Sequence, residues 1–147
     1  MKNRNIVRVT LYLLLLIGLF LPFIAQAEEV IQESQYLSKA VLCKDVEDKE
    51  PVFETTSFRV WDEKVVSWLR FTYDLPEPFK LTWEWVDPEE KIYHVGELEM
   101  EPGDYQNYRT WYWINIQDHY AANLLGDWKV RVYIDNILLA VQDFSIE

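Results

Sequence analysis

The clearest pattern in the chain is a strict alternation of apolar and polar residues between positions 79 and 85. The apolar set is Phe79, Leu81, Trp83 and Trp85, and the polar set is Lys80, Thr82 and Glu84. A period of two is the geometry of a β-strand with one face buried and one face in water. The same alternation recurs where Trp128, Val130, Val132 and Ile134 are separated by charged or polar residues. Both segments are therefore predicted to be strands whose tryptophans lie in the core.

Further apolar-rich segments predict additional strands at short spacing. They cover residues 37–43, 64–73, 108–116 and 137–146, with a weaker strand or irregular edge segment at 52–60. The segment 91–100 alternates poorly. Turn signals separate the strands: the charged run 44–50 followed by Pro51, the proline-containing segments at 75–78, 87–90 and 101–104, and the pair Asp135-Asn136.

One helical turn is predicted at 117–126, with Asp118 as its N-cap and Gly126 as its stop. About seven short strands without a second helix predict an all-β fold, an antiparallel sandwich of two sheets. A small β-barrel is the alternative.

The end of the chain resembles the last hairpin of exported bacterial immunoglobulin-like domains, because it carries Gly126-x-Trp128-x-Val130 followed by Phe144-Ser145-Ile146. Three earlier segments extend the resemblance: 48–52 (DKEPV), 81–85 (LTWEW) and 109–111 (RTW). In that order they are similar to an uncharacterised bacterial family, a domain of unknown function. The resemblance covers roughly residues 41–146. It implies an immunoglobulin-like β-sandwich, and it implies no activity.

The N-terminus has the organisation of an export signal. Three basic residues lie before position 9, an apolar run covers 11–25, and Ala25-Gln26-Ala27 is a small-x-small cleavage site. A helix over that run spans about 22 Å, less than the roughly 30 Å hydrocarbon core of a bilayer. We therefore predict a signal peptide at 1–27, a flexible acidic lead-in at 28–36 and one β-sandwich domain at 37–147, in the periplasm or outside the cell. A membrane anchor through residues 6–27 is the alternative.

The charge of the exported part restricts its partners. Residues 28–147 hold 11 Lys and Arg against 25 Asp and Glu, a formal charge of −14. Nucleic acids and anionic lipid surfaces attract Lys and Arg, so both are excluded as partners, and a membrane remains only if the signal is uncleaved. An unknown protein, or a neutral or cationic ligand, is expected instead.

Few residues offer chemistry for catalysis or metal binding. Cys43 is the only cysteine, which excludes an internal disulfide, and we predict that it is buried in a strand. The only histidines, His94 and His119, are interpreted as a partly buried, hydrogen-bonded strand residue and a polar loop residue. The acidic run 45–50 lacks the alternating Asp/Asn and central Gly of a calcium loop. No cofactor, no metal and no enzymatic activity are therefore expected.

The strand at 108–116 supplies the candidate site. Tyr108, Tyr112, Ile114 and Ile116 share one face, and Arg109, Trp111, Trp113 and Asn115 share the other. If the isoleucine face is buried, two tryptophans lie about 7 Å apart on the outer surface of the sheet. The alternative is that the faces are inverted, or that a crossing loop covers both rings.

Exposed aromatic residues mark recognition sites. Arg109, Trp111 and Trp113 are accordingly the predicted binding residues. The function expected is that of an exported, non-catalytic binding or interaction module of unknown ligand, which recognises envelope-associated proteins and is too acidic for nucleic acid. A carbohydrate-binding module that uses the exposed tryptophans is the alternative.

Overall fold

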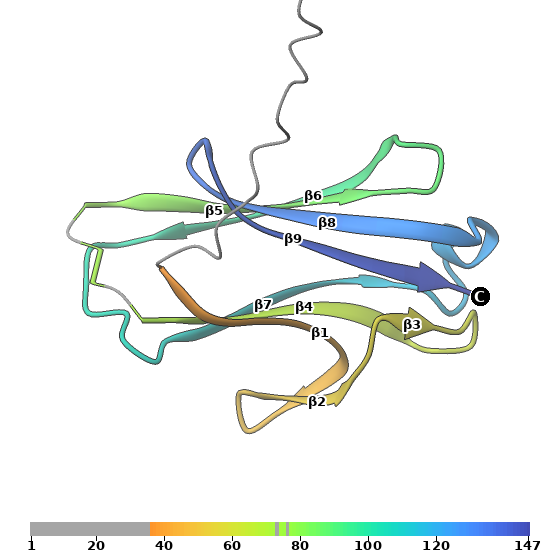
Figure 1. Ribbon diagram of the computed structural model, residues 1–147, viewed down its shortest axis with the longest axis horizontal. Coiled ribbons are helices and arrows are strands. Elements are labelled where there is room, and N and C mark those ends of the chain that lie inside the picture. Colours follow the sequence, from red (N-terminus) through yellow and green to blue (C-terminus); the bar gives the residue numbers. More distant parts are fainter. Residues whose placement is uncertain (1–35, 73, 76) are drawn as a thin grey trace, which may run out of the picture. The chain divides into compact units, whose positions relative to one another are not determined.

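The computed structural model describes residues 36–72, 74–75 and 77–147, which form strands in two layers (Figure 1). The predicted signal peptide, and the lead-in as far as residue 35, lie outside these residues. The strands are β1 (Leu37–Glu47), β2 (Glu50–Glu54), β3 (Ser57–Phe58), β4 (Lys64–Phe71), β5 (Phe79–Val86), β6 (Ile92–Met100), β7 (Arg109–Asn115), β8 (Gly126–Ile134) and β9 (Ile137–Ile146).

The strands pair into a four-stranded sheet in the order β2-β1-β4-β7 and a five-stranded sheet in the order β3-β9-β8-β5-β6. All pairs are antiparallel except the short pair β3–β9. The two sheets remain separate in the described part of the chain, so the fold is the predicted open sandwich and the barrel alternative is wrong. None of the described helical segments has the length and apolar character needed to cross a membrane.

The core between the sheets contains the residues that the alternation predicted. Trp83, Trp85 and Trp128 are fully buried, and Trp128 stacks on Phe144 with ring centroids 5.9 Å apart. The hairpin of β8 and β9 turns at Asp135-Asn136, as predicted. Burial of such large aromatic side chains supplies the main favourable free energy of folding in a chain without disulfides.

The prediction of a long charged turn at 44–50 was wrong. The strand β1 continues to Glu47, and only Asp48 and Lys49 form the turn into β2. Both turn residues have positive φ angles, 50° and 67°, as a two-residue hairpin turn requires. The charged residues point to water, so their polarity indicated exposure and not the end of the strand.

Two other segments differ from the prediction. Residues 92–100 form the edge strand β6, whose alternation is poor because Ile92, Val95 and Leu98 remain exposed at the rim of the sheet. The helical turn at 117–126 shrinks to a 3₁₀ turn at Tyr120–Asn123 with His119 at its N-cap. Gly126 does not end that turn; with a φ of 125° it begins β8.

Candidate functional site

The strand β7 has the two faces that its sequence predicts. Thr110 and Ile114 point into the sandwich and are buried, whereas Arg109, Trp111 and Trp113 lie on the outer face of the four-stranded sheet. The ladder with β4 places Trp111 opposite Trp68 and Trp113 opposite Val66. The three predicted site residues therefore lie on one surface, beside a second row of apolar side chains from β4.

The β1–β2 hairpin covers part of this surface. Trp68 is fully buried, and its indole Nε1–H donates a hydrogen bond of 2.9 Å to the carbonyl oxygen of Lys49 in the hairpin turn. Below the hairpin lies a small apolar cluster, separate from the main core, that consists of Cys43, Val66 and Trp68 with Val41, Val46 and Trp111 packed against it. Trp111 is therefore half-buried. The alternative that a crossing segment covers both tryptophan rings is correct for Trp111 and wrong for Trp113.

Two ion pairs join the hairpin to the strands that it crosses. The guanidinium Nε of Arg109 lies 2.5 Å from the carboxylate of Glu50, and Lys64 Nζ lies 2.8 Å from Asp45 Oδ1. The hydrogen bond from Lys64 lowers the pKa of the Asp45 carboxyl below its usual range. Each pair is partly exposed and contributes at most about 1 kcal/mol to stability. The carboxylate that pairs with Arg109 is thus Glu50 of the same chain and not a group of a ligand.

Burial also affects the one cysteine. Cys43 is fully buried, as predicted, although it lies in the outer cluster and not in the main core. Burial raises the pKa of the Cys43 thiol from 9.0 to about 11, and the nearby carboxylate of Glu54 acts in the same direction. The thiol is therefore protonated at neutral pH and is no nucleophile.

Trp113 is the ring that the hairpin leaves uncovered. Its side chain keeps 47% of its surface exposed, at the outer end of a sheet whose order stops at β7. The amide of Ile116, just after β7, donates a hydrogen bond to the carbonyl oxygen of Glu63, just before β4. In an antiparallel ladder such bonds alternate along the strand, so the main-chain groups of Trp111 and Trp113 face away from β4. Among the described residues no strand pairs with that edge.

On its inner side, β7 is held against the other sheet by Tyr112. The Tyr112 ring stacks on Trp83 and on His94, with centroid distances of 5.6 and 5.7 Å, and its hydroxyl lies 3.2 Å from His94 Nε2. Gly96 leaves room for the ring, because a Cβ at that position would lie 2.4 Å from Tyr112 ring atoms. His94 makes the predicted hydrogen bond, but it is exposed and not partly buried.

The remaining candidates for chemistry are dispersed. His119 is exposed at the start of the 3₁₀ turn. Two closely spaced pairs of acidic residues, Glu89 with Glu90 and Glu97 with Glu99, are exposed as well. Within the part of the chain that the structure describes, no three His, Cys, Asp or Glu side chains gather into a group that could hold a metal ion.

Sequence reasoning missed a second exposed aromatic pair. Trp61, in the turn before β4, and Tyr120, in the 3₁₀ turn, line an open hollow at one end of the sandwich. The available signal was a tryptophan in the polar turn 59–64 (RVWDEK), where no alternation assigns it to a core.

Comparisons with known proteins identify the fold. An immunoglobulin-like protein from Pseudomonas aeruginosa is similar in structure, with a TM-score of 0.56 and 14% sequence identity, over 80% of this chain and 99% of that chain. An alkylpurine DNA glycosylase from Pseudomonas fluorescens, bound to DNA with an abasic-site analogue, gives a TM-score of only 0.40 at 11% identity. That match covers 63% of this chain and 27% of that chain, and it bears on neither fold nor function.

No protein-family model matches the sequence. No curated protein matches it either. The chain is thus an immunoglobulin-like β-sandwich by structure, and its function has to be argued from its own surface.

Proposed function

We propose that this chain is an exported, non-enzymatic recognition module that binds a protein partner at the free edge of β7. The observation that carries the proposal is Trp113, a large aromatic ring that is 47% exposed on an edge strand whose outer main-chain groups pair with no strand among the described residues. An extended segment of a partner can add to such an edge through main-chain hydrogen bonds, while a side chain of the module provides an apolar contact. Tryptophan is among the residues that contribute most to binding energy in protein interfaces.

The neighbourhood of Trp113 supports a preformed site. The β1–β2 hairpin holds Trp111 and Trp68 below it, and Tyr112 fixes the inner side of the strand. Because these contacts already position the edge, less free energy is lost to ordering of the site when a partner binds. The charges of Arg109 and Lys64 are already paired within the protein, so the proposed contact relies on the exposed Trp113 ring and the main chain of β7.

The same proposal includes the location of the protein outside the cytoplasm and its membership of a family. Export to the periplasm or the medium rests on the N-terminal signal, and membership of the uncharacterised exported family rests on the segments quoted above. The formal charge of −14 favours a neutral or cationic partner and disfavours nucleic acid.

A quantitative co-purification from the envelope of the native cell tests the proposal. Full-length tagged protein is compared with Trp113→Ala and with Trp61→Ala, which removes another exposed tryptophan as a matched control. We expect a reproducible protein partner whose recovery falls at least about tenfold with Trp113→Ala, because a tenfold loss corresponds to about 1.4 kcal/mol of binding energy. Trp61→Ala should retain the partner.

Stability of the variants has to be measured in parallel. Trp113→Ala should change the free energy of unfolding by less than about 1 kcal/mol, since the ring is exposed. If no protein is recovered with the wild type, or if Trp113→Ala binds normally, this function is wrong.

A further inference from the structure

A second site lies at the end of the sandwich, where the turn after β3 meets the segment after β7. Its lining consists of Val60, Trp61, Gln117, Asp118, His119, Tyr120, Ala122 and Asn123, around a hollow of about 690 Å³. This volume lies in the range of small-molecule sites. The hollow is built from other residues than the proposed protein-binding edge, so the inference is independent of that function.

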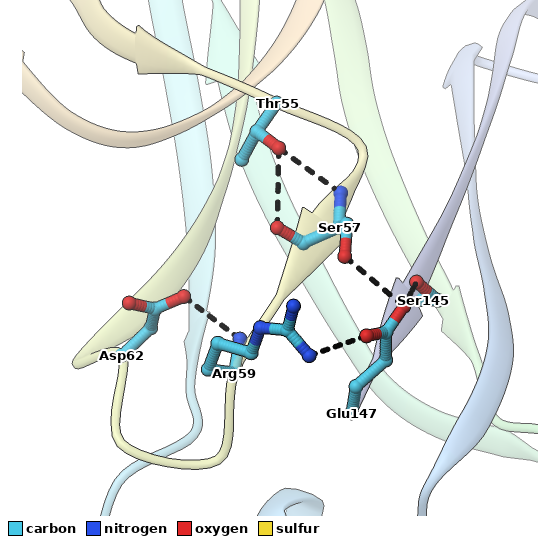
Figure 2. Close-up of polar contacts among 6 residues, drawn as sticks. All are labelled: Thr55, Ser57, Arg59, Asp62, Ser145 and Glu147. Carbon is cyan, nitrogen blue, oxygen red and sulfur yellow. Dashed lines mark hydrogen bonds and ion pairs between the residues drawn. The ribbon is translucent and has the colours of Figure 1, made fainter.

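The turn that carries Trp61 is rigidly anchored. Asp62 accepts a hydrogen bond of 2.8 Å from the amide of Arg59, and its own amide donates to the Arg59 carbonyl at 2.9 Å. Lys44 Nζ pairs with the other carboxylate oxygen of Asp62 at 2.8 Å. Figure 2 shows that Arg59 in turn reaches Glu147 at the end of β9, where it forms an ion pair. Trp61 therefore projects from a fixed turn.

The segment that carries Tyr120 is held equally well. His119 donates its amide to the carbonyl of Ile116 at 3.0 Å, and Ala121 next to Tyr120 is fully buried. The amide of Gln117 donates to the carbonyl of Asp62 at 3.1 Å, which joins the two segments directly. The two aromatic side chains are thus presented by one connected scaffold.

Both rings face water although the segments that carry them are anchored by hydrogen bonds. Trp61 keeps 68% of its surface exposed and Tyr120 keeps 66%. The two rings line the same hollow, and apolar surface gathered in one place on a soluble protein marks an interaction site. The rings therefore provide flat apolar surfaces on which a ligand can rest.

The polar lining defines the ligand class. Gln117, Asn123 and His119 offer amide and imidazole groups, which both donate and accept hydrogen bonds. The lining contains no lysine or arginine, and its only carboxylate is Asp118. Within the lining itself, an anionic ligand would meet the like charge of Asp118 and no cationic side chain. The site suits a molecule with apolar C–H faces and many neutral hydroxyl groups.

We infer that this hollow binds a neutral saccharide, with the sugar ring against Trp61 or Tyr120 and its hydroxyls bonded to the amide side chains. Sugars combine an apolar ring face with a rim of hydroxyl groups, which matches this arrangement of flat rings and amides. The inference places carbohydrate recognition at the end of the sandwich and not at Trp111 and Trp113.

A glycan array probed with the full chain tests the inference. The array carries neutral oligosaccharides of glucose, mannose, xylose and N-acetylglucosamine beside sulfated and sialylated glycans, and positive probes are then titrated in solution. We expect binding to at least one neutral class. Trp61→Ala and Tyr120→Ala should each weaken it at least tenfold, and Trp61→Phe should retain most of it.

Trp113→Ala is the matched control and should bind the same glycan within about twofold of the wild type. Thermal melts show whether each variant is folded. Absence of binding to every neutral glycan, binding to charged glycans only, or unchanged binding by Trp61→Ala would overturn the inference. A folded Trp113→Ala that loses the glycan would overturn it too, because the sugar would then lie on β7. If Trp113→Ala loses the protein partner in the co-purification but still binds the glycan, the result bears only on the proposed function and not on this inference.

Discussion

Two tryptophans on the same face of β7 have different surroundings, although they lie only two residues apart. Trp111 packs against the cluster below the β1–β2 hairpin, whereas Trp113 lies beyond it and remains exposed. The difference arises because the hairpin turn reaches Trp68, which is opposite Trp111 in the ladder. Only Trp113 is therefore free to bind a partner without a cost in stability, and a loss of Trp111 would also disturb the outer cluster.

At the same scale, Cys43 should make stability depend on alkaline pH. Its folded-state pKa of about 11 lies above the value of 9.0 that applies when the chain is unfolded. The native state thus disfavours the thiolate, and stability is unaffected below about pH 9 and falls as the pH rises from about 9 to 11. The loss approaches about 3 kcal/mol, at 1.36 kcal/mol for each pKa unit.

Denaturant melts of the wild type and of Cys43→Ala between pH 7 and pH 11 measure this effect. Tyrosine and lysine side chains titrate in both proteins, so the difference between the two curves isolates Cys43. The two curves should converge as the pH rises. Parallel curves would show that Cys43 is not in the apolar environment described.

At the scale of the elements, the edge strands β6 and β7 are joined across the two sheets by one tyrosine. Tyr112 lies against Trp83 and His94, over a position where only glycine leaves enough space. Protein interiors are packed densely, so added atoms at such a contact displace the ring or the strand. The position of the proposed binding edge therefore depends on a residue of the opposite sheet.

Gly96→Ala should destabilise the domain by about 1–3 kcal/mol, because its Cβ would overlap the Tyr112 ring. Gly103→Ala is the matched control, since its Cβ would meet the Tyr105 ring at an ordinary 3.6 Å, and it should be close to neutral. Denaturant melts provide the free energies. In a Tyr112→Ala background the cost of Gly96→Ala should largely disappear. An equal cost in both backgrounds would exclude the close contact.

At the scale of the whole molecule, charge restricts which partners the surface can bind, and the predicted export signal would restrict where it meets them. Ion pairs such as Lys39–Glu54 and Lys129–Glu90 lie at the surface, yet acidic residues remain in large excess. A strongly acidic protein repels other polyanions and attracts cationic segments. The proposed partners are therefore neutral or cationic, and the export signal that places them outside the cytoplasm remains a prediction.

Cleavage after Ala27 is the prediction at this scale. Intact mass spectrometry of protein recovered from expressing cells should show a chain that begins at Glu28. Ala27→Phe should block processing, because the cleavage site needs a small residue at that position. A wild-type species that retains Met1 and fractionates only with membranes would support the anchor alternative instead.

The sequence by itself determined the class of fold and which face of several strands is buried. The period-two patterns placed Trp83, Trp85 and Trp128 in the core and assigned Trp113 to the outer face of its strand. This succeeded because alternation is a property of the local backbone, in which successive side chains point to opposite faces. Edge strand β6 escaped the same reasoning, since a rim position relaxes the requirement for alternation.

Only the tertiary structure decided which outward residues are covered and which are free. The hairpin over Trp68, the Tyr112 ring over Gly96, and the hollow that Trp61 and Tyr120 both line each bring together segments that are distant in the sequence. Such contacts depend on which strands pair and how the loops cross, and a local pattern carries no information on either. For that reason the sequence alone predicted a face with two exposed tryptophans, whereas the fold buries half of one and presents another aromatic pair at the end of the sandwich.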